Sequence, residues 1–365
     1  MRKVKIGILG CGVISNTYIK DILRLYPELE IKAVADVDLE KVKAHAQLYH
    51  IANAYTVDEL LADSEIEIVV NLTPPALHTE LNRRILNSGK NVYCEKPFAL
   101  TLKEAQETCE LAAKQNLRIG SAPDTFMGSS LMTCRKLLNT GWIGKPLYVC
   151  ANMMSSGVET WHAYPFNFYK YGAGPLYDMG PYYFSALITM FGAAESIQAL
   201  SGKGFEERTI YSEPHKGETL QVEIPTHYAV LVRMKNGIIA NINFSFDIWK
   251  SSMPMMEVYG TDGTLTVPDP NMSGGNAKVY RKEQKLAEVM GGVDTGEGES
   301  FTLPELYQNV GIYTRGAGVL DLAKAIVNNT ENTANGTLAT HVIEMITGTI
   351  ASAEYGTIYH MTTTV

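Results

Sequence analysis

The sequence predicts an α/β protein in two parts: a doubly wound parallel sheet, then an α+β domain with a large, open, mostly antiparallel sheet. Short apolar strands alternate with helical patterns through the first third of the chain, which is typical of a parallel sheet with helical crossovers. From about residue 122 long strand-like runs follow one another, and Lys235-Asn236-Gly237 separates two of them as a hairpin turn does. Because 365 residues suit two domains, we expect them at residues 1–122 and 123–365.

Composition and charge favour small-molecule chemistry. Apolar residues make up 45% of the chain and charged residues 19%, as in a globular protein, and the net charge of −8 argues against a nucleic-acid or anionic-membrane surface. No signal peptide and no apolar run long enough to span a bilayer is apparent. Five cysteines without paired spacing and eight scattered histidines predict neither a disulfide framework nor a metal site, so we expect buried thiols in a reducing cytoplasm.

The first strand leads into a glycine-rich turn. An apolar run at residues 4–9 is followed by Gly10-Cys11-Gly12-Val13-Ile14-Ser15, and apolar residues then recur at helical spacing as far as Leu25. Glycines permit a tight turn and let the backbone approach a pyrophosphate, which then lies on the amino terminus of the helix. Ser15 stands where a third small residue is usual. We expect Gly10, Gly12, Val13 and Ile14 to contact a dinucleotide.

A carboxylate ends the second strand. Asp36 lies 21 positions after Ser15, close to the ~20 expected for a residue that binds the adenosine ribose hydroxyls. A carboxylate there repels a 2′-phosphate, which favours NAD over NADP, although Lys41 and Lys43 nearby keep NADP open. Asp36 could instead cap the next helix, but Asp38 is better placed to do so.

The βα rhythm continues with a strand at residues 67–72 and then Thr73-Pro74-Pro75-Ala76-Leu77-His78, whose prolines open a helix. We expect His78 to lie on the surface of that helix or to pack beneath it. A strand at residues 91–94 then ends in Glu95-Lys96-Pro97. Ligands bind outside the carboxyl ends of parallel strands, so Lys96 is expected on the nicotinamide side of the crevice rather than as a solvated surface lysine.

Taken in order and spacing, these motifs resemble the Gfo/Idh/MocA family, which includes glucose–fructose oxidoreductase and inositol dehydrogenases. The resemblance covers essentially the whole chain. It rests on Gly10-Cys11-Gly12, Asp36, Thr73 to His78, Glu95-Lys96-Pro97, the segment Gly172-Ala173-Gly174-Pro175-Leu176-Tyr177-Asp178-Met179-Gly180, and the late strand Met256-Glu257-Val258-Tyr259-Gly260 followed by Thr261-Asp262-Gly263-Thr264-Leu265.

The resemblance implies an NAD-binding Rossmann domain in which Thr73, Pro74, His78, Glu95 and Lys96 contact the cofactor. It implies oxidation of a secondary hydroxyl of a sugar, glycoside or cyclitol, and a second domain whose sheet roofs the site and builds homodimers or homotetramers. Two other activities stay open: an enzyme that keeps its NAD and oxidises and re-reduces one substrate transiently, and a nucleotide-sensing regulator of the same fold.

The chemistry requires one group to take the hydroxyl proton while hydride leaves the same carbon. Lys96, with its pKa depressed by partial burial, is expected to do so. Asp178 and Tyr182 are four residues apart and would share a helix face, although Pro181 would kink that helix or mark its start. In the family a histidine usually stands at the Tyr182 position, where it takes or gives the hydroxyl proton, and glucose–fructose oxidoreductase resembles this chain in having tyrosine. Tyr182 could carry the proton if Lys96 lies close to it, because a cation favours the phenolate, or it could be a core or pocket-wall aromatic. Asp178 would bind a substrate hydroxyl or hold the lysine.

His162 is a second candidate proton carrier, because an unperturbed imidazole titrates near neutral pH. It lies shortly before the glycine-rich segment, in a stretch rich in aromatic residues, and an ordinary loop histidine is the alternative. The aromatic side chains suit stacking on a sugar ring, and would equally suit a subunit interface.

Overall fold

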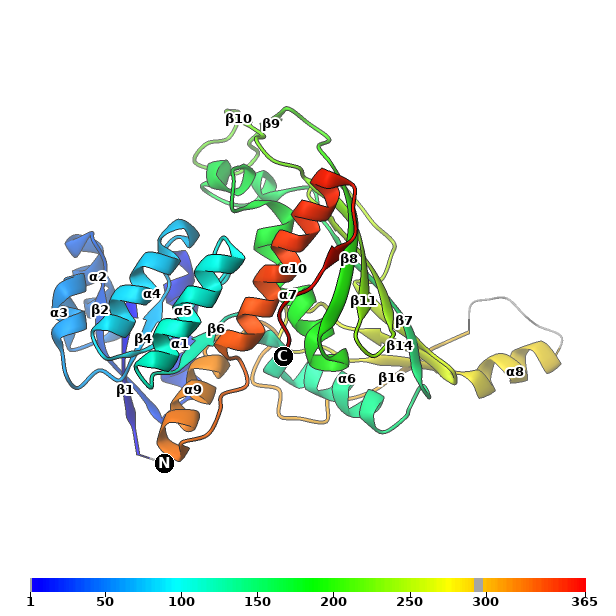
Figure 1. The fold of residues 1–365 in the computed structure, drawn as a ribbon, viewed down its shortest axis with the longest axis horizontal. Helices are drawn as coiled ribbons and strands as arrows, with labels where there is room; N and C mark the ends of the chain where they lie inside the picture. Colours follow the sequence, from blue (N-terminus) through cyan, green and yellow to red (C-terminus); the bar gives the residue numbers. More distant parts are fainter. Residues whose placement is uncertain (1, 292–297) are drawn as a thin grey trace. The chain divides into compact units, whose positions relative to one another are not determined.

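The computed structural model describes residues 2–291 and 298–365. The chain divides into two compact units, the first formed by Met1–Met127 with Tyr313–Glu344 and the second by Gly128–Ile312 with Met345–Val365 (Figure 1). The first unit thus ends a few residues after the expected boundary at 122. It also includes a segment from near the end of the chain, which a single division into 1–122 and 123–365 leaves out.

The first unit is built on a parallel sheet of six strands in the order β3-β2-β1-β4-β5-β6. The chain works outward from β1 in one direction and, from β4, in the other, so the expected doubly wound sheet is confirmed. The point where the order reverses lies between β1 and β4. The strands are β1 (Val4–Leu9), β2 (Leu29–Ala35), β3 (Asn53–Tyr55), β4 (Ile68–Asn71), β5 (Asn91–Cys94) and β6 (Ile119–Ser121).

Helices cover both faces of this sheet, as a parallel sheet requires. On one face Ile6 and Ile8 belong to a buried core with Tyr18 of α1 and Leu322 of α9, whereas Leu60 of α3 lies against Gly7. The late helix α9 thus contributes to the core of the first unit. The helices are α1 (Val13–Leu25), α2 (Leu39–Tyr49), α3 (Val57–Ala62), α4 (His78–Asn87), α5 (Leu102–Lys114), α9 (Ala317–Asn328) and the first part of α10 (Gly336–Tyr355).

Short polar residues begin three of these helices. The Asp38 side chain accepts a hydrogen bond from the Lys41 amide at the start of α2, while Thr56 and Thr101 form capping boxes at the starts of α3 and α5. Asp38 is therefore the cap of α2, which leaves Asp36 available for another role.

The second unit contains a sheet of nine strands in the order β16-β15-β14-β13-β7-β12-β11-β8-β17. All neighbours are antiparallel except β7 and β12, and Lys235-Asn236-Gly237 forms the expected hairpin, with Gly237 at φ +89°. The strands are β7 (Pro146–Met154), β8 (Ala194–Gly202), β11 (His227–Met234), β12 (Ile239–Ser245), β13 (Met256–Gly260), β14 (Gly263–Val267), β15 (Lys278–Arg281), β16 (Phe301–Thr302) and β17 (Tyr359–His360); β9 (Glu207–Thr209) and β10 (Thr219–Gln221) pair separately.

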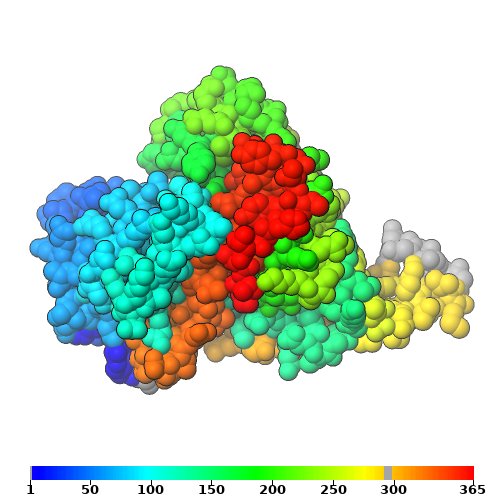
Figure 2. Space-filling model, in the orientation of Figure 1, coloured from blue at the N-terminus to red at the C-terminus, as the bar shows by residue number. Residues whose placement is uncertain are grey.

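Helix α7 (Gly174–Phe191) packs on one face of the large sheet. Tyr183 and Phe184 meet Phe244 of β12 edge to face, with ring centroids 5.7 and 5.4 Å apart. Helix α6 (Ser129–Asn139) also belongs to this unit, with short helical turns η3 (Val158–Thr160) and η4 (Pro165–Tyr169). Helix α8 (Lys282–Met290) follows β15 near one edge of the sheet (Figure 1), and none of its residues is buried. Its surface is part of the yellow region of Figure 2.

Candidate cofactor site and active-site residues

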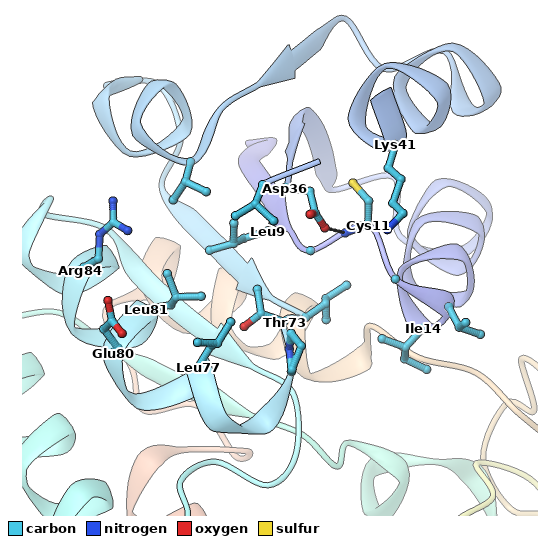
Figure 3. A pocket seen from close by; sticks show the side chains of 17 residues that line it. Leu9, Cys11, Ile14, Asp36, Lys41, Thr73, Leu77, Glu80, Leu81 and Arg84 are labelled. Atoms are coloured by element: carbon cyan, nitrogen blue, oxygen red, sulfur yellow. Dashed lines mark hydrogen bonds between the residues drawn. The ribbon is translucent and has the colours of Figure 1, made fainter. Parts of the chain in front are cut away.

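A cavity of about 520 Å³ opens at the carboxyl ends of β1, β2 and β4 in the first unit. It lies at the point where the strand order reverses, the position at which open α/β sheets bind ligands. Seven of the ten residues expected to contact a cofactor line it: Gly10, Gly12, Val13, Ile14, Asp36, Thr73 and Pro74 (Figure 3).

The glycines of the first turn have two different roles. Gly10 adopts φ +105°, and a Cβ there would lie 2.8 Å from the carbonyl carbon of Leu72, so a larger residue would push the turn away from the end of β4. A Cβ on Gly12 would meet nothing within 4 Å. Gly12 begins α1 without a side-chain cap, and the first turn of α1 contains no acidic residue. The helix start is therefore suited to an anion such as a pyrophosphate.

Asp36 is fixed beside this turn by two backbone amides. Its Oδ2 accepts a hydrogen bond of 2.7 Å from the amide of Cys11 (Figure 3). Its Oδ1 accepts one of 3.1 Å from the amide of Asp38. The carboxylate is thus held in the cavity wall before any ligand binds.

The two lysines near Asp36 differ in position. Lys41 lines the cavity, and its ammonium lies 3.3 Å from the Asp38 carboxylate. Lys43 pairs with Glu40 at 2.8 Å and does not line the cavity. The single lysine at the cavity is therefore attracted by a carboxylate of its own helix.

One face of α4 forms a wall that the sequence reading missed. Leu77, Glu80, Leu81 and Arg84 line the cavity, and Arg84 pairs with Asp58 at 2.7 Å. These positions follow the i, i+3, i+4, i+7 pattern of one helix face, so the signal was present in the sequence. The two leucines give this side of the cavity an apolar wall.

Asn71, the last residue of β4, shapes the turn that contains Thr73. Its side-chain oxygen accepts hydrogen bonds from the Thr73 hydroxyl at 2.7 Å and the Thr73 amide at 3.3 Å, and its amide group donates to Asn82 of α4 at 2.8 Å. Asn71 is fully buried, so this polar pair is shielded from water. The Thr73 turn is thereby fixed at the cavity.

The other three residues expected at the cofactor do not line this cavity. His78 is fully buried, so it packs beneath its helix rather than lying on the surface. Glu95 is also buried: its Oε1 accepts a hydrogen bond of 2.8 Å from the Tyr18 hydroxyl, and its Oε2 one of 2.9 Å from the amide of Lys96. Lys96 is half-buried rather than a solvated surface residue. Glu95 therefore connects the backbone of Lys96 to α1, the helix that starts at the cavity.

Asp178 and Tyr182 lie on α7 in the second unit. The helix begins at Gly174, with Pro175 in its first turn, and continues through Pro181, so both side chains lie on one helix, one turn apart. Asp178 is half-buried and Tyr182 is buried.

His162 lies in the same unit and is influenced by Asp178. Burial lowers the pKa of His162 from its ordinary value, and the Asp178 carboxylate opposes that effect. The amide of Tyr164 donates to Nδ1 at 3.0 Å, so Nδ1 is an acceptor and a neutral ring carries its proton on Nε2. The ring packs against Phe168, with centroids 4.9 Å apart. The Asp178 carboxylate therefore acts electrostatically on the His162 ring, a relation that the sequence alone did not indicate.

Fold and cavity together define a nucleotide-binding α/β protein. The chain matches two family models: residues 4–122 match "Oxidoreductase family, NAD-binding Rossmann fold" and residues 131–266 match "GFO/IDH/MocA C-terminal domain". The chain therefore belongs to the Gfo/Idh/MocA family of oxidoreductases.

The relatives agree with this assignment. An "Uncharacterized oxidoreductase C115.03" of Schizosaccharomyces pombe is 29% identical over 54% of this chain and 55% of that protein, so the match spans about half of its length. "Trans-1,2-dihydrobenzene-1,2-diol dehydrogenase" of Xenopus tropicalis is 27% identical over 76% of this chain and 87% of that protein. The structure of levoglucosan dehydrogenase in complex with NADH and levoglucosan covers 99% of both chains, with a TM-score of 0.80 at 17% identity, and so shares the fold.

The described ranges contain no helix long and apolar enough to cross a membrane. Within those same ranges there is no group of three or more His, Cys, Asp or Glu residues arranged to hold a metal ion.

Proposed function

We propose that this oxidoreductase uses NAD and transfers hydride between the nicotinamide and a secondary hydroxyl or keto group of a sugar, glycoside or cyclitol. The observation that carries the cofactor assignment is the Asp36 carboxylate, held in the cavity wall by the amides of Cys11 and Asp38. The substrate class is supported by the family and by the similarity to levoglucosan dehydrogenase.

The residues present fit NAD. The uncapped start of α1 after Gly12 would hold the pyrophosphate, and Asp36 would accept hydrogen bonds from the adenosine ribose hydroxyls. Leu77, which precedes α4, and Leu81 of α4 would pack against the adenine. When bound, NAD supplies the acceptor of the hydride.

The preference for NAD over NADP follows from charge. A 2′-phosphate would place at least one negative charge beside the Asp36 carboxylate, and like charges repel. Two cations line the cavity and could offset this repulsion, but each already lies beside a carboxylate: Lys41 is 3.3 Å from Asp38 and Arg84 is 2.7 Å from Asp58.

Proton transfer is assigned to the side chains that the family resemblance indicates. Lys96 takes the proton of the substrate hydroxyl, and its half-buried position favours the neutral amine needed for that step. Asp178 binds a substrate hydroxyl or holds the lysine. Tyr182 is the second proton carrier, and His162 takes that role if Tyr182 does not.

The experiment that tests this function is absorbance at the reduced-nicotinamide band, recorded for purified protein with NAD and a panel of sugars, glycosides and inositols. The preparation is first checked for co-purified cofactor. Growth of the band with one substrate class identifies a dehydrogenase and its chemistry. Tightly held cofactor without growth of the band for any substrate contradicts the proposal, and favours an enzyme with transient redox chemistry or a regulator.

We further propose that the protein is a homodimer or homotetramer assembled through the large sheet. The face opposite α7 is only partly buried across several strands: Leu231 is 49% exposed and Ile239 40%, while Tyr148 and Tyr259 stack there with ring centroids 5.7 Å apart. Apolar side chains in such a position are typical of a covered surface.

All five cysteines are free thiols, which fits the reducing cytoplasm that we propose as the location of the protein.

A further inference from the structure

His78 joins two turns of the first unit that carry proposed functional residues. The residue is fully buried at the start of α4. Its Nδ1 lies 2.7 Å from the carbonyl oxygen of Pro97, and its Nε2 lies 2.7 Å from the carbonyl oxygen of Thr73. One ring therefore connects the turn that lines the cavity to the turn that follows Lys96.

Both contacts require a donor on the ring. A carbonyl oxygen only accepts hydrogen bonds, and a neutral imidazole has a single N–H. In a neutral ring the second nitrogen would direct its lone pair at a carbonyl oxygen 2.7 Å away, and the ring is fully buried, so bulk solvent does not screen the repulsion. An imidazolium donates to both carbonyls, and such charge-assisted bonds are stronger than neutral ones.

The surrounding charges bear on the same question. Burial lowers the pKa of His78 below its ordinary value and outweighs the carbonyls of Pro97 and Thr73 and the Glu95 carboxylate, which raise it, while Lys96 lowers it further. The two short carbonyl contacts are therefore the observation that favours the charged ring. Glu95 is 7% exposed, so its negative charge acts on the ring through a poorly screened medium. Glu95 is thus positioned as the counter-charge of a protonated ring.

We propose that His78 is a positioning residue that is held as an imidazolium. Its two N–H groups donate hydrogen bonds to the Thr73 turn of the cofactor cavity and to the Lys96–Pro97 turn, and so fix the position of one turn relative to the other. This inference rests on the proposed role of Lys96 in proton transfer. It adds a specific consequence, because the repulsion between His78 and Lys96 is mutual. A charged ring disfavours the ammonium form of Lys96 and so favours the amine that accepts a proton.

The protonation state can be measured without any turnover. The full-length protein is labelled with ¹⁵N-histidine, and the ring nitrogens are observed by long-range ¹⁵N–¹H correlation at pH 7. His78→Gln and His78→Asn identify the His78 signals by their loss, and His360→Gln, at an exposed position in the second unit, is the matched control. We expect both nitrogens of His78 to carry hydrogen. A nitrogen without hydrogen at pH 7 would overturn the imidazolium.

The two variants also separate the two bonds. The asparagine amide can replace Nδ1 toward Pro97 and the glutamine amide can replace Nε2 toward Thr73, but neither carries charge or bridges both carbonyls. For both we expect kcat to fall on the order of 10–100-fold, as when a catalytic group is misplaced, with a much smaller change in the Kd for NADH. The pH–rate limb that reports Lys96 should move to higher pH, because a neighbouring positive charge has been removed.

Failure of this inference and failure of the proposed function have different signatures. If the wild type oxidises a sugar but kcat and its pH profile are unchanged in both variants, the positioning role is wrong and the function stands. If no substrate is oxidised, the proposed function fails, while the ¹⁵N spectrum still decides whether the ring is doubly protonated.

Discussion

Replacing Arg208 by methionine should destabilise the second unit through the loss of a buried cation. Arg208 of β9 is 7% exposed, and its guanidinium donates to Glu159 of η3 at 2.6 Å and to Asp247, which follows β12. Glu159 also accepts a hydrogen bond from the Tyr169 hydroxyl. This network consists of Arg208, Glu159, Asp247 and Tyr169. Its hydrogen bonds connect the segment before His162 to the end of β12.

The magnitude follows from burial. The side chains of Arg208 and Glu159 are 6% and 3% exposed, so their attraction is poorly screened, and removing the arginine leaves the two carboxylates without the cation that balances their charge. Breaking a buried pair in this way costs about 3–5 kcal/mol, whereas an exposed pair contributes about 0–1 kcal/mol. Methionine retains much of the apolar volume of the arginine stem, so we attribute the loss mainly to charge.

The assay is urea unfolding followed by tryptophan fluorescence, since Trp142, Trp161 and Trp249 all belong to the second unit. We expect Arg208→Met to lower the free energy of unfolding by about 3–5 kcal/mol. Lys282→Met is the matched control, because Lys282 pairs with Asp262 at 2.9 Å on the surface of the same unit.

A double variant tests the cause of the loss. Adding Glu159→Gln to Arg208→Met should cost less than Glu159→Gln alone, because the glutamate has already lost its cation. A loss under about 1 kcal/mol for Arg208→Met, equal to the surface control, would refute the reasoning.

Four further predictions concern the proposed site residues. Lys96→Ala should lower kcat by about 10²–10⁴-fold while NADH still binds, as measured by steady-state rates and fluorescence titration, and unchanged turnover would remove Lys96 from proton transfer. If Tyr182→Phe leaves the rate and its pH profile intact, His162 becomes the second proton carrier. Asp36→Ala should bring the Kd for NADPH closer to the Kd for NADH. Equal affinities of the wild type for the two cofactors would show that Asp36 does not select NAD. Because burial lowers the pKa of His162, the unfolded chain binds a proton more readily, so stability should fall as the pH drops below about 6.5; His162→Gln should flatten that decline in urea-unfolding free energy.

Local sequence signals were sufficient to predict much of the first unit. The Gly10 turn, the position of Asp36 after β2 and the proline-led start of α4 each depend on a few neighbouring residues, and the cavity is where the strand order predicts it. Helix α7 runs through Pro181, which the sequence left undecided, because a proline either ends or kinks a helix and only the packing around it determines which.

Other features depend on residues far apart in the chain. Arg208 meets Glu159 across 49 positions, and nothing in either local sequence identifies the partner. The apolar stripe of α9 could pack on either sheet, and only the folded chain shows that it joins the core of the first unit.

The sequence by itself determined the class of fold, the cofactor turn and the residues that resemble the family's catalytic set, because periodicity and turn chemistry act over short stretches. Only the tertiary structure shows that His78 is buried between two carbonyl oxygens and that Glu95 accepts a hydrogen bond from Tyr18. It also shows that the Asp178 carboxylate acts electrostatically on the His162 ring. Burial and partner choice depend on which faces meet when the chain folds, and a linear pattern leaves that choice open.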